Sequence, residues 1–325
     1  MKNRDKVLQI LYKKNGECIS STEIAQDLDI TRSAIFKIIN ELKNQGYNIE
    51  SIHHKGYRLL ECEDLISVDI INEILSKNKK HKKIKYLKTV DSTNTLAKKI
   101  IIENAEFPDV VIANTQTNGR GRLGRNFYSP ENKGIYCSFI LEPFIKIENS
   151  ILVTVAASVA VSKAIEKITG RNTQIKWIND IYIDNKKVSG ILTEAVTNFE
   201  TGMIDKIVLG VGINFKMQEN SFPGEISDIA TAIYTDSTQG ITRNKLIAQL
   251  ILEIDECIGN IEDPNIIAYY TKKSIVIGKE INIHVLGEKE SISGKAVNID
   301  KNGFLIVETK NGLITLNSGE VSIRF

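Results

Sequence analysis

A glycine- and arginine-rich connection between two apolar runs is the feature that most restricts the fold of this sequence. The runs Val110–Thr115 and Ile135–Leu141 are predicted to be buried strands. In the connection, Gln116–Pro130, three glycines alternate with three arginines: Gly119, Arg120, Gly121, Arg122, Gly124 and Arg125. Glycine lets the backbone approach a ligand closely, and arginine offers a planar set of donors that suits phosphate or carboxylate. The connection therefore predicts a flexible loop that closes over an anionic ligand such as a nucleotide.

Other glycine-rich signatures do not account for this loop. It lacks the G-x-x-x-x-G-K-[ST] pattern of a P-loop and the G-x-G-x-x-G pattern of dinucleotide-binding folds. Gly-Arg-Gly-Arg also occurs in disordered RNA-binding tails. The apolar runs on both sides favour a loop inside a folded domain, because disordered tails lack such flanks.

Length and charge limit the classes of protein to consider. The 325 residues predict two or three domains, and the formal charge of +2 means that any nucleic-acid contact must come from a local patch. The first residues carry no apolar signal region. The longest apolar run, Ile151–Val161, is interrupted by Thr154 and Ser158 and is too short to span a bilayer. We therefore expect a cytoplasmic protein without a membrane partner.

Cysteine and histidine usage argues against a metal centre. The four cysteines, Cys18, Cys62, Cys137 and Cys257, form no C-x-x-C pair, and the four histidines have no metal-ligand spacing. We expect reduced cysteines and no metal held by fixed protein ligands.

The first sixty residues predict a winged helix-turn-helix domain. A helical period begins near Val7, the pair Ser20 and Glu23 forms a capping box for a second helix, and Thr31 caps a third. Two extended segments between residues 47 and 60 then complete a hairpin.

The exposed residues of this domain are typical of DNA binding. The candidates lie on the third helix and at the hairpin tip: Thr31, Arg32, Ser33, Lys37, His54 and Lys55. Such side chains reach base edges and phosphates when a recognition helix enters the major groove. The alternative is a helical protein-interaction module with solvated charges. The order of cap, turn and wing favours DNA.

A lysine-rich stretch follows the acidic residues 61–64, which mark a domain boundary. Seven lysines occur between residues 77 and 88 without a carboxylate. Such a run predicts a solvated surface, and the alternative is a surface that faces a polyanion.

Polar residues at the ends of predicted strands mark the central domain. Asp91–Asn94 follows the strand Lys85–Val90, where it can both cap a helix from Thr95 and cradle a ligand. Lys187 begins an apolar strand, so that its ammonium group can enter a site while its stem stays buried. Gly212, at the end of the strand 207–211, permits a ligand to approach the backbone. From Ser274, short alternating strands predict a small SH3-like barrel.

Five motifs occur in the order found in biotin protein ligases: Asp91–Asn94, Gly119–Arg125, Lys176–Asp180, Lys187–Gly190 and Gly210–Asn214. With the winged helix-turn-helix, the chain resembles the bifunctional class, in which the ligase is also the biotin operon repressor. The resemblance implies an α+β fold in three parts. These are a winged helix-turn-helix domain (1–62), a class II synthetase-like mixed sheet with helices (63–272) and an SH3-like β-domain (273–325).

The resemblance also implies the activity and the partners. Biotin carboxylate attacks the α-phosphate of MgATP to give biotinyl-5′-AMP, and a lysine of a biotin carboxyl carrier protein or another biotin-dependent carboxylase then accepts the biotin. The implied cofactors are biotin, ATP and Mg²⁺, the last bound with ATP. The implied DNA partner is the operator of biotin genes, bound by a homodimer that forms with biotinyl-AMP as corepressor.

The matching positions carry over roles residue by residue. Around biotin the resemblance places Ser92, Thr93, Asn94, Gln116, Gly119, Arg120, Arg122 and Lys187. Around ATP and the adenylate it places Arg122, Arg125, Phe127, Asn179, Asp180, Lys187 and Asn214. The catalytic assignments are Lys187, Arg122 and Arg125, because joining two anions requires positive charge and orientation.

The sequence departs from the family pattern at two positions. Ile178 replaces a usual proline, and Phe127 replaces a common tryptophan. One alternative function is a transcription factor whose ligase-like domain only senses a ligand, but the arginines and Lys187 are retained. Lipoate ligase is the nearest enzyme alternative, and its Arg-Arg-x-x-Gly-Gly-Gly pattern is absent.

Overall fold

The chain folds as two units, residues 1–81 with 239–248 and residues 82–238 with 249–325. The computed structural model describes residues 3–14, 16–44, 47–60, 65–103, 106–142, 145–146, 150–197, 203–218, 221–224, 226–235, 237–238, 240–284, 291–317 and 319–323. Among these residues no helix combines the length and the apolar character needed to cross a membrane. Cys62 and the expected boundary at 61–64 lie outside the described residues. The three predicted domain ranges therefore stay predictions.

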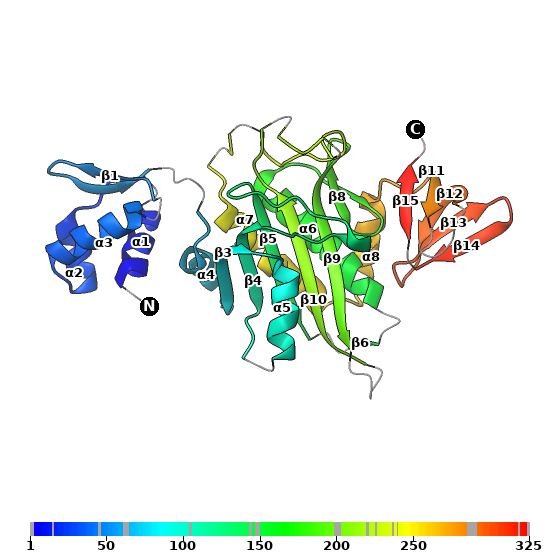
Figure 1. The fold of residues 1–325 in the computed structure, drawn as a ribbon, viewed down its shortest axis with the longest axis horizontal. Coiled ribbons are helices and arrows are strands. Elements are labelled where there is room, and N and C mark those ends of the chain that lie inside the picture. The colour runs from blue at the N-terminus through cyan, green and yellow to red at the C-terminus, as the bar shows by residue number, and fades with distance from the viewer. Residues whose placement is uncertain are drawn as a thin grey trace. The chain divides into compact units, whose positions relative to one another are not determined.

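The predicted winged helix-turn-helix forms most of the first unit. Its elements are α1 (Asn3–Lys13), α2 (Ser21–Leu28), α3 (Arg32–Asn44), β1 (Ile49–Ile52) and β2 (Gly56–Leu59) (Figure 1). Ser20 Oγ accepts a hydrogen bond from the amide of Glu23 at 3.0 Å, and Thr31 Oγ1 accepts one from Ala34 at 3.2 Å. Both predicted helix starts are confirmed. The core draws on all five elements: Val7, Leu8, Leu11, Ile19, Ile24, Ile35, Ile39, Leu42, Ile49 and Leu59.

Helix α4 (Val68–Ser76) was not predicted from the sequence. Ser67 caps this helix, and its side-chain oxygen accepts from the amide of Ile70 at 3.4 Å. The start of α7 (Arg243–Gly259) holds the same segment, because Asn244 Oδ1 accepts from the Ser67 amide at 2.8 Å. The spacing of Ile70, Ile71 and Leu75 is a helical signal, but the segment is short and lies between acidic and lysine-rich stretches that are typical of a linker.

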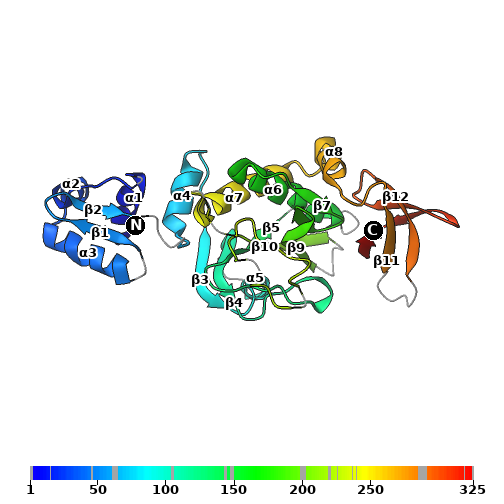
Figure 2. The same cartoon turned by 90° about the horizontal axis from the view of Figure 1, so that it is seen from above.

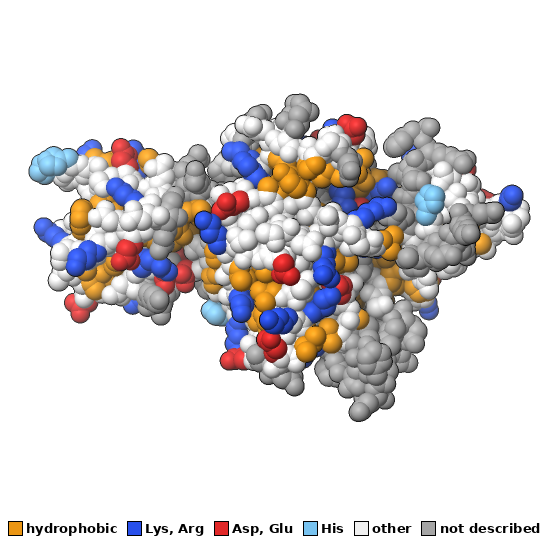
Figure 3. All heavy atoms as spheres, viewed as in Figure 1, with side chains coloured by type: hydrophobic (Ala, Val, Ile, Leu, Met, Phe, Trp, Pro, Cys, Tyr) orange, Lys and Arg blue, Asp and Glu red, His pale blue; other side chains and the backbone are white. Residues whose placement is uncertain are grey.

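The lysine-rich stretch 77–88 forms a charged surface with acidic partners. Lys82 pairs with Asp255 at 2.9 Å, and Lys83 pairs with Glu106. On the face drawn in Figure 3, Lys and Arg side chains alternate with Asp and Glu over the lower part of the second unit. This arrangement supports the interpretation of the stretch as a solvated surface.

An eight-stranded mixed sheet forms the centre of the second unit. Its order is β3 (Ile84–Val90), β4 (Val110–Gln116), β5 (Gly134–Leu141), β10 (Met203–Asn214), β9 (Lys186–Thr197), β8 (Asp180–Ile183) and β7 (Gln174–Lys176), with β6 (Ile145–Lys146) on β10. The pair β3–β4 is parallel, and the other strand pairs of this sheet are antiparallel within the described residues. Strands β9 and β10 are longer than predicted and form one extended hairpin.

Helices cover both faces of this sheet (Figure 2). Helix α5 (Thr93–Ile102) packs on β4, β5 and β10, whereas α6 (Ser150–Thr169) packs on β7, β8 and β9. Helix α5 begins at Thr93, two residues before the predicted start, because Ser92 accepts from the amide of Thr95 at 3.4 Å and so caps it. Thr93 and Asn94 therefore belong to the first helical turn.

The carboxyl-terminal residues form a five-stranded antiparallel sheet. Its order is β14 (Gly312–Leu316), β13 (Leu305–Thr309), β12 (Ile292–Ile299), β11 (Glu280–His284) and β15 (Glu320–Ile323). Strand β15 was not predicted. Among the described residues no pairing joins β14 to β15, so the sheet is shown and closure into a barrel is not. Trp177 Nε1 donates to the Gly303 carbonyl at 3.1 Å and ties this sheet to the central one.

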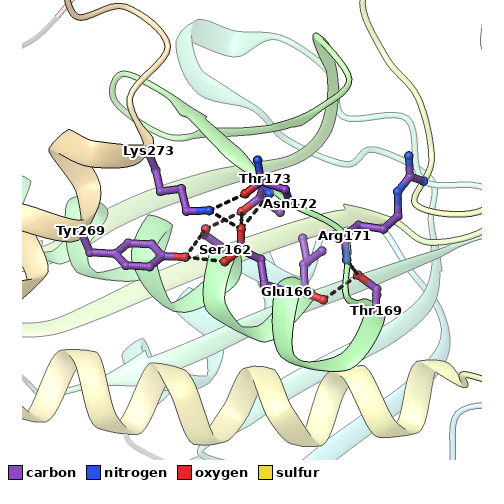
Figure 4. Close-up of polar contacts among 9 residues, drawn as sticks. Ser162, Glu166, Thr169, Arg171, Asn172, Thr173, Tyr269 and Lys273 are labelled. Atoms are coloured by element: carbon purple, nitrogen blue, oxygen red, sulfur yellow. Dashed lines mark hydrogen bonds and ion pairs between the residues drawn. The ribbon is translucent and has the colours of Figure 1, made fainter.

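A polar network joins α6, β7 and α8 (Pro264–Lys273), as Figure 4 shows. The carboxylate of Glu166 accepts from the Thr173 amide at 2.8 Å, from Tyr269 Oη at 3.0 Å and from Lys273 Nζ at 2.6 Å. Burial by itself would raise the pKa of Glu166. The hydrogen bonds outweigh burial and lower this pKa below its ordinary value of 4.5. The charged form of Glu166 therefore stabilises the packing of α8 on α6.

We predict that Glu166→Gln lowers the free energy of unfolding at neutral pH by about 1.5–3 kcal/mol, because four donors, the amide and hydroxyl of Thr173, Tyr269 Oη and Lys273 Nζ, then lose a charged acceptor. A carboxyl group with a lowered folded-state pKa stabilises fully above its unfolded pKa, and this contribution is lost as the pH falls through the folded-state pKa. The difference between wild type and variant should therefore shrink below about pH 4.5.

Urea unfolding followed by circular dichroism at neutral and acidic pH measures this difference. Glu103→Gln is the matched control, because Glu103 pairs with Lys99 at 3.7 Å on the surface and its loss should change stability by less than about 0.5 kcal/mol. Equal effects of the two variants would contradict the assignment.

Candidate functional site

A cavity of about 440 Å³ lies where the polar strand ends, the arginine loop and the carboxyl-terminal sheet meet. Most of the predicted ligand-binding residues line it: Ser92, Thr93, Asn94, Gln116, Arg120, Arg122, Arg125, Phe127, Asn179, Asp180, Lys187 and Asn214. Its size is typical of a site for a small molecule or cofactor. The fold thus gathers residues that are more than a hundred positions apart in the sequence.

The start of α5 is fixed by hydrogen bonds in the lining of the cavity. The amide and hydroxyl of Thr93 both donate to Gln116 Oε1, at 2.8 and 3.1 Å. Gln116 Nε2 donates in turn to Ser129 Oγ at 2.9 Å. Ser138 Oγ, on β5, lies 2.7 Å from Thr93 Oγ1 and 2.6 Å from Asn94 Oδ1. These residues therefore form a rigid polar pocket within the cavity.

Glu194 holds the side chain of Asn94 by a hydrogen bond and was not identified from the sequence. Asn94 Nδ2 donates to Glu194 Oε2 at 2.8 Å, and Lys98 Nζ donates to Glu194 Oε1 at 2.6 Å. Burial raises the pKa of Glu194, but the bonds from Lys98 and Asn94 and the positive charge of Arg120 together lower it below its ordinary value. Glu194 is therefore ionised at neutral pH and holds Asn94 in place.

Lys187 and Arg122 are held by two polar neighbours, Asp180 at the start of β8 and Asn179 just before it. Lys187 Nζ lies 2.7 Å from Asp180 Oδ1, and Arg122 donates to Asn179 Oδ1 at 3.1 Å. Arg122 also makes a long contact of 3.5 Å with the Gly319 carbonyl. Lys187 and Arg122 bring positive charge to the cavity, where an anionic group would bind.

Phe127 forms an aromatic wall of the cavity. Gly190 and Gly212 are cross-strand partners in β9 and β10, and the ring lies over both. A methyl group at Gly212 would lie 2.6 Å from the ring. The sequence analysis expected this glycine to admit a ligand, whereas in the structure the space above it is filled by Phe127. Asn214 donates to the Thr231 carbonyl at 3.0 Å beside this wall.

The structure places one predicted residue outside the lining and adds others. Gly119 lies behind the cavity, where a side chain would meet Ser129 Oγ at 2.6 Å. The added lining residues include Lys176 and Trp177 from β7 and the residue after it, and others from an irregular segment, from the arginine loop and from the carboxyl-terminal part of the chain: Tyr128, Phe222, Ile226, Ile229, Ala230, His284 and Gly319. The irregular segment that contains Phe222, Ile226, Ile229 and Ala230 was not predicted, because its apolar residues follow neither a helical nor a strand period. It is held by Lys187, whose amide donates to the Ile229 carbonyl at 2.8 Å.

Comparisons with known proteins assign this architecture. The biotin/lipoate A/B protein ligase family matches residues 86–214, an HTH domain matches 3–58, and the biotin protein ligase C terminal domain matches 276–324. The bifunctional ligase/repressor BirA of Bacillus subtilis is 32% identical over 98% of both chains, and that of Escherichia coli is 30% identical over 95% of this chain and 94% of its own.

The chain belongs to the bifunctional biotin ligase/repressor family. A solved biotin protein ligase from Aquifex aeolicus, in complex with biotin and ATP, superposes with a TM-score of 0.60 at 29% identity, covering 74% of this chain and 98% of its own. The predicted family and fold class are confirmed. The roles of single residues stay predictions.

The two departures from the family pattern have defined surroundings in this ligase/repressor. Ile178 follows a cis peptide bond, and its carbonyl accepts from Ser158 Oγ at 3.1 Å and from Tyr270 Oη at 3.0 Å. Phe127 meets Tyr136 edge-on, with ring centroids 6.4 Å apart. The phenylalanine ring, which is smaller than the tryptophan common in the family, therefore contacts an aromatic neighbour.

The predicted DNA-contacting residues of this ligase/repressor lie on the surface of the first unit. Arg32, Ser33 and Lys37 are exposed on α3, and His54 and Lys55 are exposed in the turn between β1 and β2. The side chain of Thr31 caps α3, and its Oγ1 lies 2.9 Å from Ser33 Oγ. The geometry leaves the basic side chains available to a partner.

We predict that Gly212→Ala destabilises the protein by about 1–3 kcal/mol, because the added methyl group overpacks against the ring of Phe127. In a Phe127→Ala background the same change should be nearly neutral, because the overlapping ring is gone. Urea unfolding of the four proteins of this double-mutant cycle measures the coupling.

Gly259→Ala is the control for this cycle. A side chain at Gly259 meets no neighbour within 4 Å, so the change should be silent or slightly stabilising. An equal cost of Gly212→Ala in both backgrounds would show that the ring is not the obstacle.

Proposed function

We propose that the second unit activates biotin with ATP and transfers it to a lysine of a biotin carboxyl carrier protein or a related carboxylase subunit. The observation that carries this proposal is the set of groups that line one cavity. A rigid polar pocket, five cationic side chains and an aromatic wall meet there, and these groups suit the ring, the reacting anions and the base of biotinyl-5′-AMP. Incubation with ATP and either biotin or lipoate, followed by measurement of pyrophosphate release, tests the substrate.

The reaction joins two anions, so the cationic residues carry the chemistry. The biotin carboxylate oxygen attacks the α-phosphorus, and the bond from that phosphorus to the bridging oxygen breaks as pyrophosphate leaves. On this proposal Lys187, Arg122 and Arg125 neutralise the charge that accumulates on the phosphate oxygens. The phosphates displace Asp180 from Lys187, with which it pairs at 2.7 Å. In the second step the acceptor amine attacks the acyl carbon, AMP leaves, and an amide forms.

Two groups of lining residues position the two substrates on this proposal. Ser92, Thr93, Asn94, Gln116 and Arg120 suit biotin, because this pocket offers fixed donors and acceptors for polar ring atoms. Gly119 supports the same pocket through the loop backbone. Phe127 stacks on the adenine, and Asn214 lies beside it, where its amide can bind a base edge.

Magnesium enters with ATP on this proposal. The described residues contain no cluster of three His, Cys, Asp or Glu side chains that could hold a metal ion alone. Asp180, with Asn179 beside it, supplies oxygen ligands in the cavity. Magnesium is commonly held by one or two carboxylates together with substrate phosphates, so the residues fit.

The first unit, on the same proposal, binds the operator of biotin genes when two chains pair. One recognition helix makes too few base contacts for a unique genomic site, whereas two on a twofold axis recognise a palindrome. Biotinyl-AMP acts as corepressor if it favours the homodimer. Linkage then requires DNA to favour the adenylate-bound dimer by the same factor.

Lys187→Ala should lower the rate of pyrophosphate release by about 100-fold or more, as expected when one preorganised charged donor is removed. Lys186→Ala is the matched control, because Lys186 is the preceding residue and is exposed outside the cavity lining. It should leave the rate nearly unchanged. A comparable loss in both variants would mean that neither ammonium acts in the site.

Arg32→Ala with Lys37→Ala should weaken operator binding by about 30-fold or more and leave biotin ligation unchanged. The measurement is a gel shift on a duplex selected from a random library by the wild-type protein with biotin and ATP. The charge-matched control is Lys272→Ala with Lys279→Ala, two exposed lysines of the second unit. Equal losses from both pairs would point to net charge alone.

Sedimentation and gel shift with and without biotin plus ATP test the coupling. The dimer and the DNA complex should both strengthen with the ligands. Equal DNA binding in both conditions would show a ligase and a DNA-binding domain that are fused without communication.

A further inference from the structure

Phe36 is an exposed aromatic residue on the recognition helix α3. Its side chain is 58% exposed, although large apolar side chains of folded proteins usually lie inside. Ile35, Ile39 and Leu42 form the buried side of α3. Within the described residues, Phe36 is not among the side chains that pack against this core. The helix therefore folds without using the ring.

The ring lies at the centre of the polar face of α3. Arg32 and Asn40 lie one helical turn before and after it, and Ser33 lies three residues before it. Lys37 is its immediate neighbour. All four of these side chains are exposed. A partner that reaches the basic residues of this face must also cover Phe36.

The chemistry of the major groove offers one kind of group for such a ring. Base edges there present hydrogen-bond donors and acceptors, and the only apolar group is the C5-methyl of thymine. A ring placed over donors or acceptors would leave them without partners. Apolar wedges that open base steps act from the minor groove, whereas a recognition helix enters the major groove.

We infer that Phe36 recognises thymine, by packing its ring on the C5-methyl group of one T·A pair in each operator half-site. The inference rests on the DNA binding proposed above. It adds an apolar contact that specifies sequence to the polar contacts of Arg32, Ser33 and Lys37. It also predicts that the selected operator carries a thymine at a fixed position in both half-sites.

Uracil replacement tests the contact, because uracil differs from thymine only by the missing methyl group. The full-length protein, with biotin and ATP, first selects duplexes from a random library. Each thymine of the selected site is then replaced by uracil in turn, at symmetric positions. We expect one position at which wild-type binding weakens by about fourfold for each methyl group removed, the value for burying one such group.

The variant Phe36→Ala should bind the thymine and uracil duplexes equally well at that position. Lys37→Ala is the contrast, because it should weaken binding to both duplexes by the same factor and keep the wild-type ratio between them. Circular dichroism and thermal unfolding establish that the variants are folded. If Phe36→Ala binds too weakly to compare, Phe36→Leu replaces it. A smaller uracil effect than in wild type then supports the contact, and an equal effect overturns it.

The outcomes separate this inference from the function on which it rests. A selected site that wild type binds with no effect of uracil at any thymine overturns the inference and leaves the repressor proposal intact. An unchanged uracil effect in Phe36→Ala also overturns it. Failure to select any sequence, with biotin and ATP present, overturns the repressor proposal itself.

Discussion

Three glycines on one face of the central sheet allow the candidate site to lie directly on the backbone of β9 and β10. Gly190 and Gly212 pair across the two strands, and Gly210 lies two residues from Gly212 on the same face. Any side chain at Gly210 would collide with Asn94, and one at Gly212 would collide with Phe127. The start of α5 and the end of the arginine loop can occupy their positions only because these glycines have no side chains.

The site also depends on acidic side chains that offset the charge of its cationic side chains. Five lysine and arginine side chains line one cavity, and unopposed charges gathered in this way would repel one another. Asp180 pairs with Lys187, and Glu194 lies close enough to Arg120 for that charge to lower its pKa. The acidic residues therefore let the protein fold with the cationic groups in place. On the proposed function, the phosphates of the ligand replace these carboxylates as partners of the cationic side chains.

The carboxyl-terminal sheet forms part of the wall of the cavity. His284 and Gly319 line it, and the Gly303 carbonyl accepts from Trp177 at 3.1 Å. Because Trp177 precedes Asn179 and Asp180 by only two and three residues, this hydrogen bond helps to fix the loop that holds Lys187 and Arg122. The network around Glu166 fixes α8, which leads into the same sheet. The sheet therefore supports the site as well as lining it.

The sequence by itself determined the winged helix-turn-helix, the buried strands on either side of the arginine loop and the groups that converge on the cavity. Caps, apolar periods and glycine–arginine spacing are local signals, and Ser20 and Thr31 act in the structure as their spacing predicts. The tertiary structure alone decided that Glu194 supports Asn94, that Phe127 fills the space above Gly212, and that Phe222 and His284 reach the cavity. These contacts join residues far apart in the chain and depend on packing volume and on burial of charge. A one-dimensional pattern carries neither quantity, because both exist only once the strands and helices have been brought together.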